Sequence, residues 1–319
     1  MQLNQQYLPP VFSDFLQKHV YLAYNPPFLA HFVPALQDII MSLPSSDQRS
    51  AEQIREHYEV EKELAAKLRN ASKADRRHLY SALYNELFQR IPHHTQLTRK
   101  VSVNETEQNV AGQVRFLKRF LNKDITFLEV GPGDCALSFE ACKWVKKVYA
   151  VDVSSEITKS AQTPANFELI LSDGCNVPVA ENSVDVAYSN QLMEHLHPDD
   201  AFEQLKHLYK AIAPGGVYIC STPNRLSGPH DVSRNFDELA TGFHLKEYTN
   251  HELAKLFKQV GFAKVQVDLG IKGNYFRLPA FPFAVLEAVF SLFPYSLRAY
   301  LGRRQPMRAF LGMRIIGVK

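Results

Sequence analysis

The sequence predicts an α/β protein built on a doubly wound, mostly parallel sheet of seven strands. Two observations lead to this prediction. From residue 124 onward, short apolar runs alternate with segments of helical pattern, which is typical of a sheet covered by helices on both faces. The first of these runs passes directly into a glycine turn and then a helical segment, as in a nucleotide-type site. The first hundred residues show helical patterns only, so we expect a helical extension in front of the sheet.

Length and composition agree with this division. A chain of 319 residues suggests about two domains, or one α/β domain with a substantial extension. We assign residues 1–101 to the helical extension and 102–319 to the main domain, with 271–312 as an insertion before the last strand. With 45% apolar and 22% charged residues, the composition excludes a disordered or collagen-like chain.

The extension is expected to contain helices with recognisable ends. Phe28–Met41 is an apolar run of helix length, and the Pro- and Ser-rich residues 42–46 end it. A polar helix follows over residues 47–70. Ser72 and Asp75 have the spacing of a capping box, and an apolar stripe at helical period follows them: Leu79, Leu83, Leu87 and Ile91. Ser102 and Glu105 repeat the capping pattern before another amphipathic helix.

The main domain is expected to alternate strands with helices. Segments of helical pattern include Ala136–Lys147 and the residues around 207–216, which end in a Pro-Gly-Gly sequence. The seven predicted strands are Ile125–Val130, Lys147–Val153, Phe167–Leu171, Val184–Ser189, Val217–Cys220, Val265–Leu269 and Arg314–Val318.

The cysteines and the amino terminus favour a cytoplasmic location. The four cysteines form no C-x-x-C pair and lie among apolar residues, which is typical of reduced structural thiols and indicates neither zinc nor disulfides. No basic segment followed by an apolar one opens the chain, so no secretory signal is expected. The longest apolar stretch, Pro279–Pro294, is too short and too interrupted for a transmembrane helix.

The glycine turn is the first element that carries chemistry. Gly131 and Gly133 follow the strand that contains Glu129, and a helical segment begins just after them. Glycine lets the backbone approach a ligand closely, and the amide groups at a helix start face that ligand. This motif alone is equally compatible with NAD.

The order of the motifs downstream distinguishes an NAD site from other nucleotide-type sites. Asp152 ends the second strand about 20 residues after the turn, where an acid can bind both hydroxyls of a ribose. Asp173 and Gly174 follow the third strand, and Asn190 closes the fourth strand ahead of Glu194 and His195. A helix, a Pro-Gly-Gly sequence and a fifth strand complete the series.

This ordered set resembles the class I S-adenosylmethionine-dependent methyltransferases, especially the small-molecule group related to quinone and sterol methyltransferases. The resemblance covers roughly residues 104–270 and 313–319. It implies a Rossmann-like sheet whose sixth strand is parallel to the others and whose last strand is antiparallel. It also implies S-adenosyl-L-methionine as the cofactor.

The resemblance also implies roles for the motif residues. Glu129, Gly131 and Gly133 would contact the amino-acid end of the cofactor, and Asp152 would hold its ribose. Asp173 would bind the adenine amino group with Gly174 beside it, and Asn190 would lie against the methionine portion. Cys135 stands where many relatives have Gly or Ala, which puts the backbone geometry of the turn in doubt.

Two histidines are candidate catalytic bases. The methyl group of the cofactor is already activated, so a base is needed only where the acceptor must lose a proton. His195 follows the fourth strand and His244 follows the fifth, and both connections open toward the cofactor. A hydrogen-bonded structural histidine is an equally good interpretation for each. Glu194 and His195 also suggest a metal, but adjacent positions do not converge without further ligands, so none is expected.

The insertion 271–312 is expected to lie at the carboxyl edge of the sheet, beside the cofactor. It joins aromatic residues to arginines, and residues 271–319 hold eight basic residues against one glutamate, a net charge of +7. An apolar helix over Phe283–Phe293 would pack on the amino-terminal helices or enter a bilayer surface. The alternatives for the segment are a substrate lid, a peripheral membrane contact and core packing. The aromatic residues are Tyr275, Phe276, Phe281, Phe283, Phe290, Phe293 and Tyr295.

We therefore expect methyl transfer from S-adenosylmethionine to an oxygen or carbon atom of a hydrophobic or aromatic small molecule. No nucleic-acid partner is expected. The tetrapeptide Asn25–Phe28 resembles a base-binding motif, but it lies far from the fourth strand, where such a motif belongs. The alternatives are an N-methyltransferase, a protein or nucleic-acid methyltransferase, an NAD or nucleotide-sugar oxidoreductase, and an inactive methyltransferase-fold interaction module. The sequence leaves the acceptor and the oligomeric state open.

Overall fold

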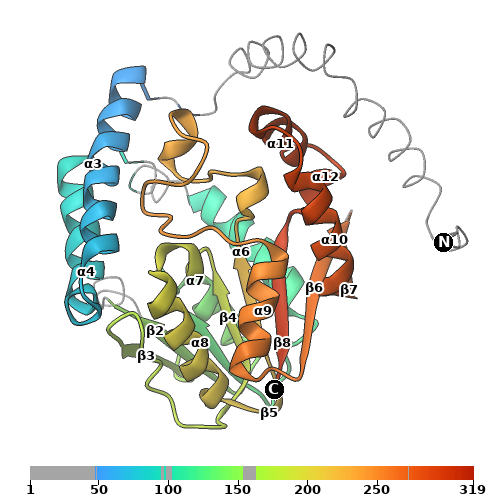
Figure 1. Cartoon of the computed structure of the whole chain (residues 1–319). Helices are drawn as coiled ribbons and strands as arrows, with labels where there is room; N and C mark the ends of the chain where they lie inside the picture. The colour runs from blue at the N-terminus through green and yellow to red at the C-terminus, as the bar shows by residue number, and fades with distance from the viewer. Residues whose placement is uncertain (1–46, 48, 95–96, 98–102, 154–162, 272) are drawn as a thin grey trace, which may run out of the picture.

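The protein forms one twisted sheet with helices on both faces (Figure 1). The computed structural model describes residues 47, 49–94, 97, 103–153, 163–271 and 273–319. The strands of the described part are β1 (Thr126–Val130), β2 (Lys147–Asp152), β3 (Phe167–Leu171), β4 (Val184–Asn190), β5 (Ile212–Thr222), β6 (Lys264–Ile271), β7 (Asn274–Pro279) and β8 (Met313–Val318). Their order across the sheet is β3-β2-β1-β4-β5-β8-β6-β7.

The strand directions agree with the predicted topology. Strands β1 to β5 pair in parallel, whereas β8 is antiparallel to both β5 and β6. The last strand is therefore antiparallel and β6 runs parallel with the rest. The sheet has eight strands in place of the seven predicted, because β7 forms an edge hairpin with β6. Most β7 side chains are exposed, so the segment shows no alternation of buried and exposed residues from which a strand could be predicted.

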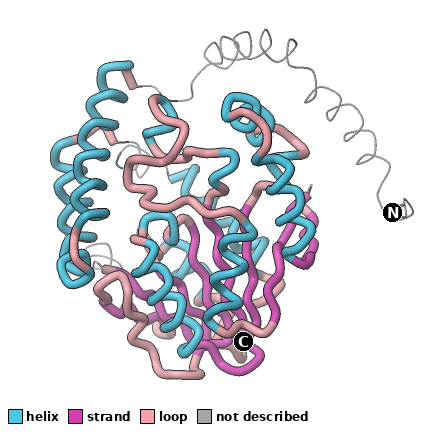
Figure 2. Tube along the Cα trace, viewed as in Figure 1, coloured by secondary structure: helices cyan, strands magenta, loops and turns pink. Residues whose placement is uncertain are grey.

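Side chains alternate between two cores, one on each face of the sheet. Leu128, Ala187 and Tyr218 point into the core beneath helices α8 (Pro198–Ala211) and α9 (Asn250–Val260). Their neighbours Phe127, Val186 and Ile219 point into the core beneath α6 (Val103–Leu117) and α7 (Ala136–Ala141). This period of two is the one that a sheet buried on both faces requires, and Figure 2 shows the helices flanking the strands.

Two predicted helical segments are shorter than expected. Helix α7 ends at Ala141, and the backbone amides of residues 143 and 144 then bond to carbonyls three residues back, which tightens the last turn. Helix α8 ends at Ala211, so the Pro-Gly-Gly sequence belongs to β5. Gly215 adopts a φ of +80° there, which glycine accepts without strain.

The described part of the extension is a helical hairpin of α3 (Ala51–Asn70) and α4 (Lys73–Arg90). Helix α3 confirms the predicted polar helix and has Ser50 as its cap. Ser72 caps α4, as predicted. Leu83, Leu87 and Ile91 are buried in the same core as Leu128, with Leu79 packed against it. Predictions for Phe28–Met41, Asn25–Phe28 and the cap at Ser102 lie outside the described residues. The boundary at residue 101 stays a prediction.

The insertion continues from β7 into α10 (Ala280–Ser291), α11 (Tyr295–Gly302) and α12 (Met307–Phe310). Helix α10 packs against α9 and β6, not against the amino-terminal helices of the described part. Its one charged residue, Glu287, faces inward, where its carboxylate accepts hydrogen bonds from the backbone amides of Asn250 (2.7 Å) and His251 (3.0 Å) at the start of α9. No helix in the described ranges is long and apolar enough to span a membrane.

Candidate functional site

The glycine turn joins β1 to α7 at the carboxyl edge of the sheet. Gly131 and Gly133 have φ values of +67° and +57°, and Gly131 donates its amide hydrogen to the carbonyl of Val151 on β2 (2.9 Å). A side chain at Gly131 would collide with Leu192, whereas one at Gly133 would enter open space. Cys135 keeps the left-handed conformation, with a φ of 58°, so the turn retains the glycine-type geometry that its sequence put in doubt.

Glu129 lies buried one residue before the end of β1. Its Oε2 accepts a hydrogen bond from the Ser138 hydroxyl (2.5 Å), a residue of α7. Burial raises the pKa of Glu129 to about 8, and the Ser138 hydrogen bond opposes that rise only in part. The group is therefore a buried carboxyl that would ionise readily beside a cationic ligand.

The other predicted cofactor residues follow the next strands at the same edge. Asp152 ends β2, Asn190 ends β4, and Asp173 and Gly174 lie in the loop after β3. The backbone amides of Cys175 (3.0 Å) and Asn176 (2.8 Å) donate to Oδ1 of Asp173. Burial would raise the pKa of Asp173, but these hydrogen bonds hold it below its ordinary value.

The extension reaches this loop. Arg77 on α4 approaches Oδ2 of Asp173 at 3.4 Å, and the ring of Tyr80 lies 3.3 Å from the point where a side chain on Gly174 would begin. Little acceptor capacity is left on Asp173, since its own loop and Arg77 use most of its lone pairs. The helical hairpin therefore lines this part of the site.

These features fit S-adenosylmethionine. The cofactor carries an amino group, two ribose hydroxyls and an adenine amine, all of which donate hydrogen bonds. Carboxylates lie at or just after the ends of the first three strands: Glu129 and Asp152 belong to the strands, and Asp173, whose oxygens are largely used by its own loop and Arg77, follows β3. Space is open beside the backbone of Gly133.

The two predicted catalytic histidines lie together. His195 ends the short 3-10 helix η2 (Met193–His195) and His244 belongs to the loop before α9; their ring centroids are 4.8 Å apart. A carboxylate oxygen of Glu194 lies within 4.8 Å of a ring nitrogen of each. Burial lowers the pKa of His195 to about 3. Burial would also lower the pKa of His244, but its hydrogen bond to Glu247 raises it above the ordinary value.

The helical hairpin supports this group from the side. The Tyr84 hydroxyl contacts Nδ1 of His195 (2.8 Å), and the ring of Tyr84 stacks on Phe243. Glu61 accepts a hydrogen bond from the backbone amide of Phe243 (2.8 Å), and Arg69 donates to three carbonyls of the His244 loop, the nearest at 2.8 Å. The loop that carries His244 is therefore held by residues of the extension.

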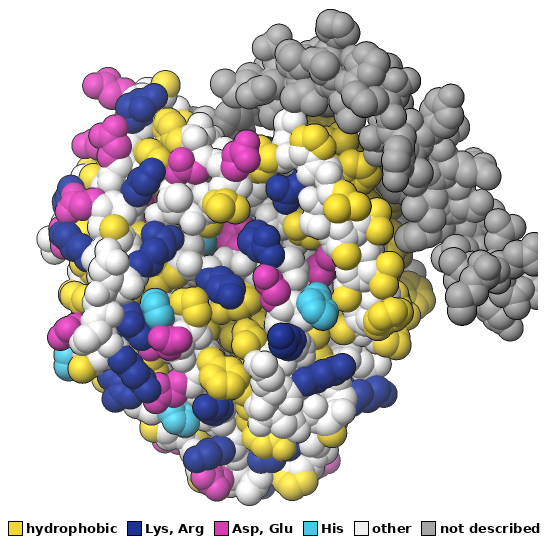
Figure 3. All heavy atoms as spheres, in the orientation of Figure 1, with side chains coloured by type: hydrophobic (Ala, Val, Ile, Leu, Met, Phe, Trp, Pro, Cys, Tyr) yellow, Lys and Arg dark blue, Asp and Glu magenta, His cyan; other side chains and the backbone are white. Residues whose placement is uncertain are grey.

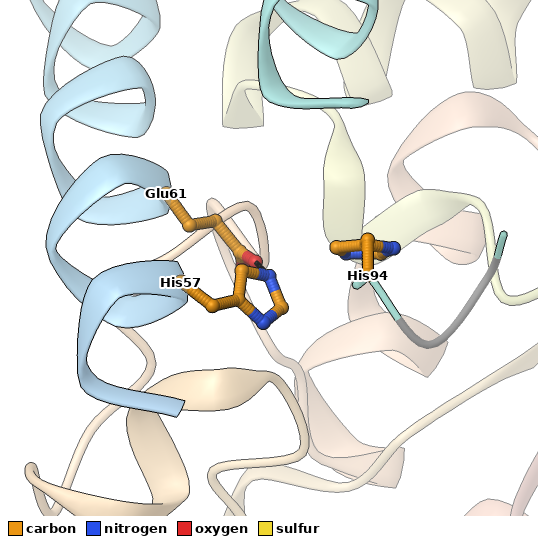
Figure 4. Close-up of side chains that lie close together, drawn as sticks. All are labelled: His57, Glu61 and His94. Carbon is orange, nitrogen blue, oxygen red and sulfur yellow. Dashed lines mark ion pairs between the residues drawn. The ribbon is translucent and has the colours of Figure 1, made fainter. Parts of the chain in front are cut away.

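A second cluster of similar composition lies on that hairpin. His57 and Glu61 belong to α3 and approach His94, which follows α4 (Figure 4). Oε2 of Glu61 lies 2.6 Å from Nε2 of His57, and Nη1 of Arg49 lies 2.7 Å from Nδ1 of the same ring. Burial lowers the pKa of His94 to about 4.

A cavity of about 650 Å³ opens beside the cofactor edge. Its lining includes Gln191 after β4, Ser221–Asn224 at the end of β5, residues of β6, the start of β8 and the α11–α12 segment. Gln191 has a φ of 54°, an uncommon conformation for a residue with a side chain. The charged or titratable residues that line the cavity are His230, Asp268, Arg303, Arg308 and Arg314.

The cavity has an excess of positive charge. Asp268 is buried and accepts two hydrogen bonds from Arg119 (both 2.9 Å), so its charge is balanced outside the cavity. Arg314 approaches Asp268 only at 3.7 Å, and its buried Nη1 has no hydrogen-bond partner within the described part of the chain. No ion pair among the described residues involves Arg303 or Arg308. An anionic ligand would complement this surface.

Sequence reasoning identified part of this arrangement. The arginine-rich insertion was noted from its charge, and its place at the cofactor edge followed from strand direction. Gln191, His230 and Glu247 were missed, because nothing in their local sequence separates them from ordinary loop residues. No metal was expected at Glu194 and His195, because their sequence shows no further ligand; in the fold, His244 lies close to both.

Comparison with known proteins gives the family. A family model described as a methyltransferase domain matches residues 104–267, just over half of the chain. One relative, from Mycolicibacterium smegmatis and named as a probable S-adenosylmethionine-dependent methyltransferase, is 34% identical over 95 residues, which cover 30% of this chain and 34% of that protein. A Mycobacterium tuberculosis protein of the same description is 27% identical over 153 residues, covering 47% of this chain and 53% of its own length.

A malonyl-[acyl-carrier protein] O-methyltransferase from Xylella fastidiosa is 26% identical over 133 residues, covering 40% of this chain and 44% of that protein. The chain thus spans between a third and about half of the length of these curated relatives. A solved S-adenosylmethionine-dependent methyltransferase from Archaeoglobus fulgidus aligns with 67% of this chain and 94% of its own, with a TM-score of 0.46 and 19% identity.

Proposed function

Since the chain belongs to the methyltransferase domain family of class I S-adenosylmethionine-dependent enzymes, we propose that it methylates an oxygen or carbon atom of a small acceptor bearing an anionic group. The cavity lined by three arginines and only one carboxylate, Asp268, is the observation that carries this proposal. The cofactor, when bound, supplies a methyl group already activated on a sulfonium. The residues of this chain then have to bind and orient the acceptor and promote the loss of its proton.

Each predicted site residue has a place in this proposal. Glu129 would bind the cofactor's amino group, and the backbone at Gly131 and Gly133 would lie against its amino-acid end. Asp152 would bind the ribose hydroxyls. Asp173 and Gly174 would border the adenine, and Asn190 would approach the methionine portion. The supporting observation is that all of them lie along one edge of the sheet.

The acceptor would enter from the arginine side. Arg314 is the least exposed of the three and has a buried nitrogen without a hydrogen bond, whereas Arg303 and Arg308 are exposed. A hydrophobic or aromatic acceptor has less support than an anionic one. None of the aromatic residues listed above for the insertion 271–312 lines the cavity. The insertion would therefore act as a lid through its arginines.

The group formed by Glu194, His195 and His244 would promote loss of the acceptor's proton. Thr222 and His230 line the cavity and connect it to this group: Thr222 donates to Glu194 (2.6 Å), and His230 shares Glu247 with His244. We propose that His195 and His244 act at the reaction centre on this ground.

The outer face of the insertion would contact an anionic membrane surface. Phe281, Val285, Val289 and Leu292, here called the outer stripe, recur on one side of α10 and its cap, and Figure 3 shows hydrophobic side chains gathered over this helix. Arginines of the same segment lie near it along the chain, at positions 277, 298, 303, 304 and 308. Apolar residues beside basic ones are typical of a peripheral membrane contact.

The function is tested by following the methyl group. Wild-type protein incubated with trideuteromethyl S-adenosylmethionine and a metabolite extract should yield labelled anionic products by mass spectrometry. Arg314→Gln should lower kcat/KM for the identified acceptor by about tenfold or more, since a charge-assisted hydrogen bond contributes roughly 1.5–3 kcal/mol. Its affinity for S-adenosylhomocysteine should stay unchanged.

Arg304→Gln is the matched control, because Arg304 belongs to the same segment and does not line the cavity. It should leave both quantities nearly unchanged. Labelled products that are all neutral or cationic would contradict the anionic acceptor. Absence of S-adenosylhomocysteine binding by the wild type would contradict the enzymatic function itself.

A further inference from the structure

Glu194 is a buried carboxylate with one oxygen left unsatisfied. The side chain is fully inaccessible, and its Oε2 accepts a hydrogen bond from the Thr222 hydroxyl (2.6 Å). Its Oε1 is buried and has no hydrogen-bond partner among the described residues. A buried carboxylate oxygen without a partner is costly, so its persistence points to a ligand.

The hydrogen bonds of the two neighbouring histidines bear on which ring nitrogen of each can accept a ligand. Nδ1 of His195 lies 3.1 Å from the carbonyl oxygen of Phe243, which can only accept, and 2.8 Å from the Tyr84 hydroxyl, which can donate or accept. In the tautomer that satisfies the carbonyl, Nδ1 donates. Nδ1 of His244 likewise donates to the carboxylate of Glu247 (2.7 Å). With Nδ1 donating in each neutral ring, Nε2 is the acceptor. A histidine that binds a metal typically donates its other nitrogen to a carbonyl or carboxylate in this way.

We propose that Glu194, His195 and His244 bind a divalent transition-metal ion. Their ligand atoms lie within 4.8 Å of one another, close enough to converge on one ion after small adjustments. Two imidazoles and one carboxylate suit zinc, iron(II) or cobalt(II) and leave coordination positions for an outside ligand. The three ligands come from two loops, after β4 and after β5, that only the fold brings together.

The site adjoins the acceptor cavity, so the inference rests on the proposed function and deepens it. Thr222 and His230 line that cavity and connect to Glu194 and to Glu247. An ion there would bind a hydroxyl oxygen of the acceptor and lower its pKa. The O–H bond breaks and the proton leaves to water. The oxygen's electron pair then forms the new bond to the methyl carbon, and the carbon–sulfur bond breaks to leave S-adenosylhomocysteine.

The cluster on the helical hairpin is an internal control, because its chemistry is different. The guanidinium of Arg49 can only donate, so Nδ1 of His57 must accept. Nε2 of His57 then carries the hydrogen and faces Glu61. No lone pair of His57 is left for a metal, and the nearby guanidinium repels a cation. Figure 4 shows the three side chains of this second cluster.

The test uses Co²⁺ as the probe and the full chain after treatment with a chelator. We expect one Co²⁺ per chain by equilibrium binding, with visible absorption bands from a nitrogen and oxygen ligand field. Glu194→Gln, His195→Gln and His244→Gln should each weaken Co²⁺ binding by about tenfold or more. The control variants His57→Gln and His94→Gln should keep the wild-type stoichiometry and spectrum.

Binding of S-adenosylhomocysteine is measured on every variant, which separates this inference from the proposed function. A wild type that binds S-adenosylhomocysteine but no Co²⁺ would overturn the metal site and leave the methyltransferase function standing. Co²⁺ bound by the wild type but unaffected by the three ligand variants would overturn the assignment. A wild type that binds no Co²⁺ overturns the site without reference to any variant, and S-adenosylhomocysteine binding shows which variants are folded.

Discussion

Glu129 shows how one residue can prepare a ligand site. It lies inside the sheet, where burial favours the neutral carboxyl and raises its pKa to about 8. The hydrogen bond from Ser138 retains the side chain in place. Opposite an ammonium group, the carboxylate would be the favoured form, so cofactor binding and deprotonation are coupled.

We therefore expect S-adenosylhomocysteine affinity to rise with pH up to about pH 8 and then to level off. Below that pH the free protein holds a proton on Glu129 that must leave on binding, which changes affinity by as much as about tenfold per pH unit. Calorimetry in two buffers of different ionisation enthalpy should detect the released proton at pH 6.5 and not at pH 9. Glu129→Gln should bind weakly and release none. Equal wild-type affinity at pH 6.5 and 8 would contradict the coupling.

The helical hairpin is joined to the sheet domain by a buried ion pair. Arg76 on α4 donates to both carboxylate oxygens of Asp200 on α8, at 2.6 and 2.8 Å, and Tyr80 donates to the same group at 2.7 Å. Burial would raise the pKa of Asp200, but the hydrogen bonds from Arg76 and Tyr80 hold it below its ordinary value. Because the hairpin also holds the His244 loop, this pair supports the candidate site from a distance.

Asp200→Ala should lower the free energy of unfolding by about 3–5 kcal/mol, because it leaves the Arg76 charge buried without a partner. Glu203→Ala on the same helix is the control and should cost less than about 1 kcal/mol, since its ion-pair partners, Lys73 and Arg77, are partly exposed. Urea denaturation measures both. The contribution of Asp200 is present at neutral pH and is lost as pH falls through its lowered pKa. Equal effects of the two substitutions would refute the anchoring role.

At the scale of the whole molecule, the insertion presents two different surfaces. Its inner side contributes arginines to the cavity and Glu287 to the start of α9. Its outer side carries the outer stripe, in which Phe281 is 75% and Leu292 is 81% exposed. The helix is thus apolar on both sides, since Phe283 and Phe290 are buried beside its one charged residue. A large exposed apolar surface such as the outer stripe marks an interaction site.

The full-length protein should sediment with vesicles that contain phosphatidylserine and less with vesicles of phosphatidylcholine alone. The combined change Phe281→Ser and Leu292→Ser should reduce that binding several-fold, and added salt should weaken the wild-type interaction as charges are screened. Leu239→Ser, which alters an exposed leucine elsewhere, is the control. Wild-type binding by the double variant would contradict the membrane contact.

Much of the fold could be predicted because burial leaves a periodic signal. The seven predicted strands are all present, since each is an apolar run with at least one face covered. Strand β7 was missed because its side chains are mostly exposed and its pairing is set by its hairpin with β6. The candidate cofactor residues could be proposed for a related reason, because the ends of parallel strands meet at one edge.

The sequence by itself determined the α/β class, the order of motifs along the sheet edge and the family to which the chain belongs. Only the tertiary structure decided which side chains meet. His244 joins Glu194 and His195, Arg314 faces a cavity built from four separate segments, and Glu287 turns inward to the start of α9. Local periodicity reports whether a residue is buried, not its partner. The partner depends on how distant loops pack, and that is settled by the free energy of the whole fold.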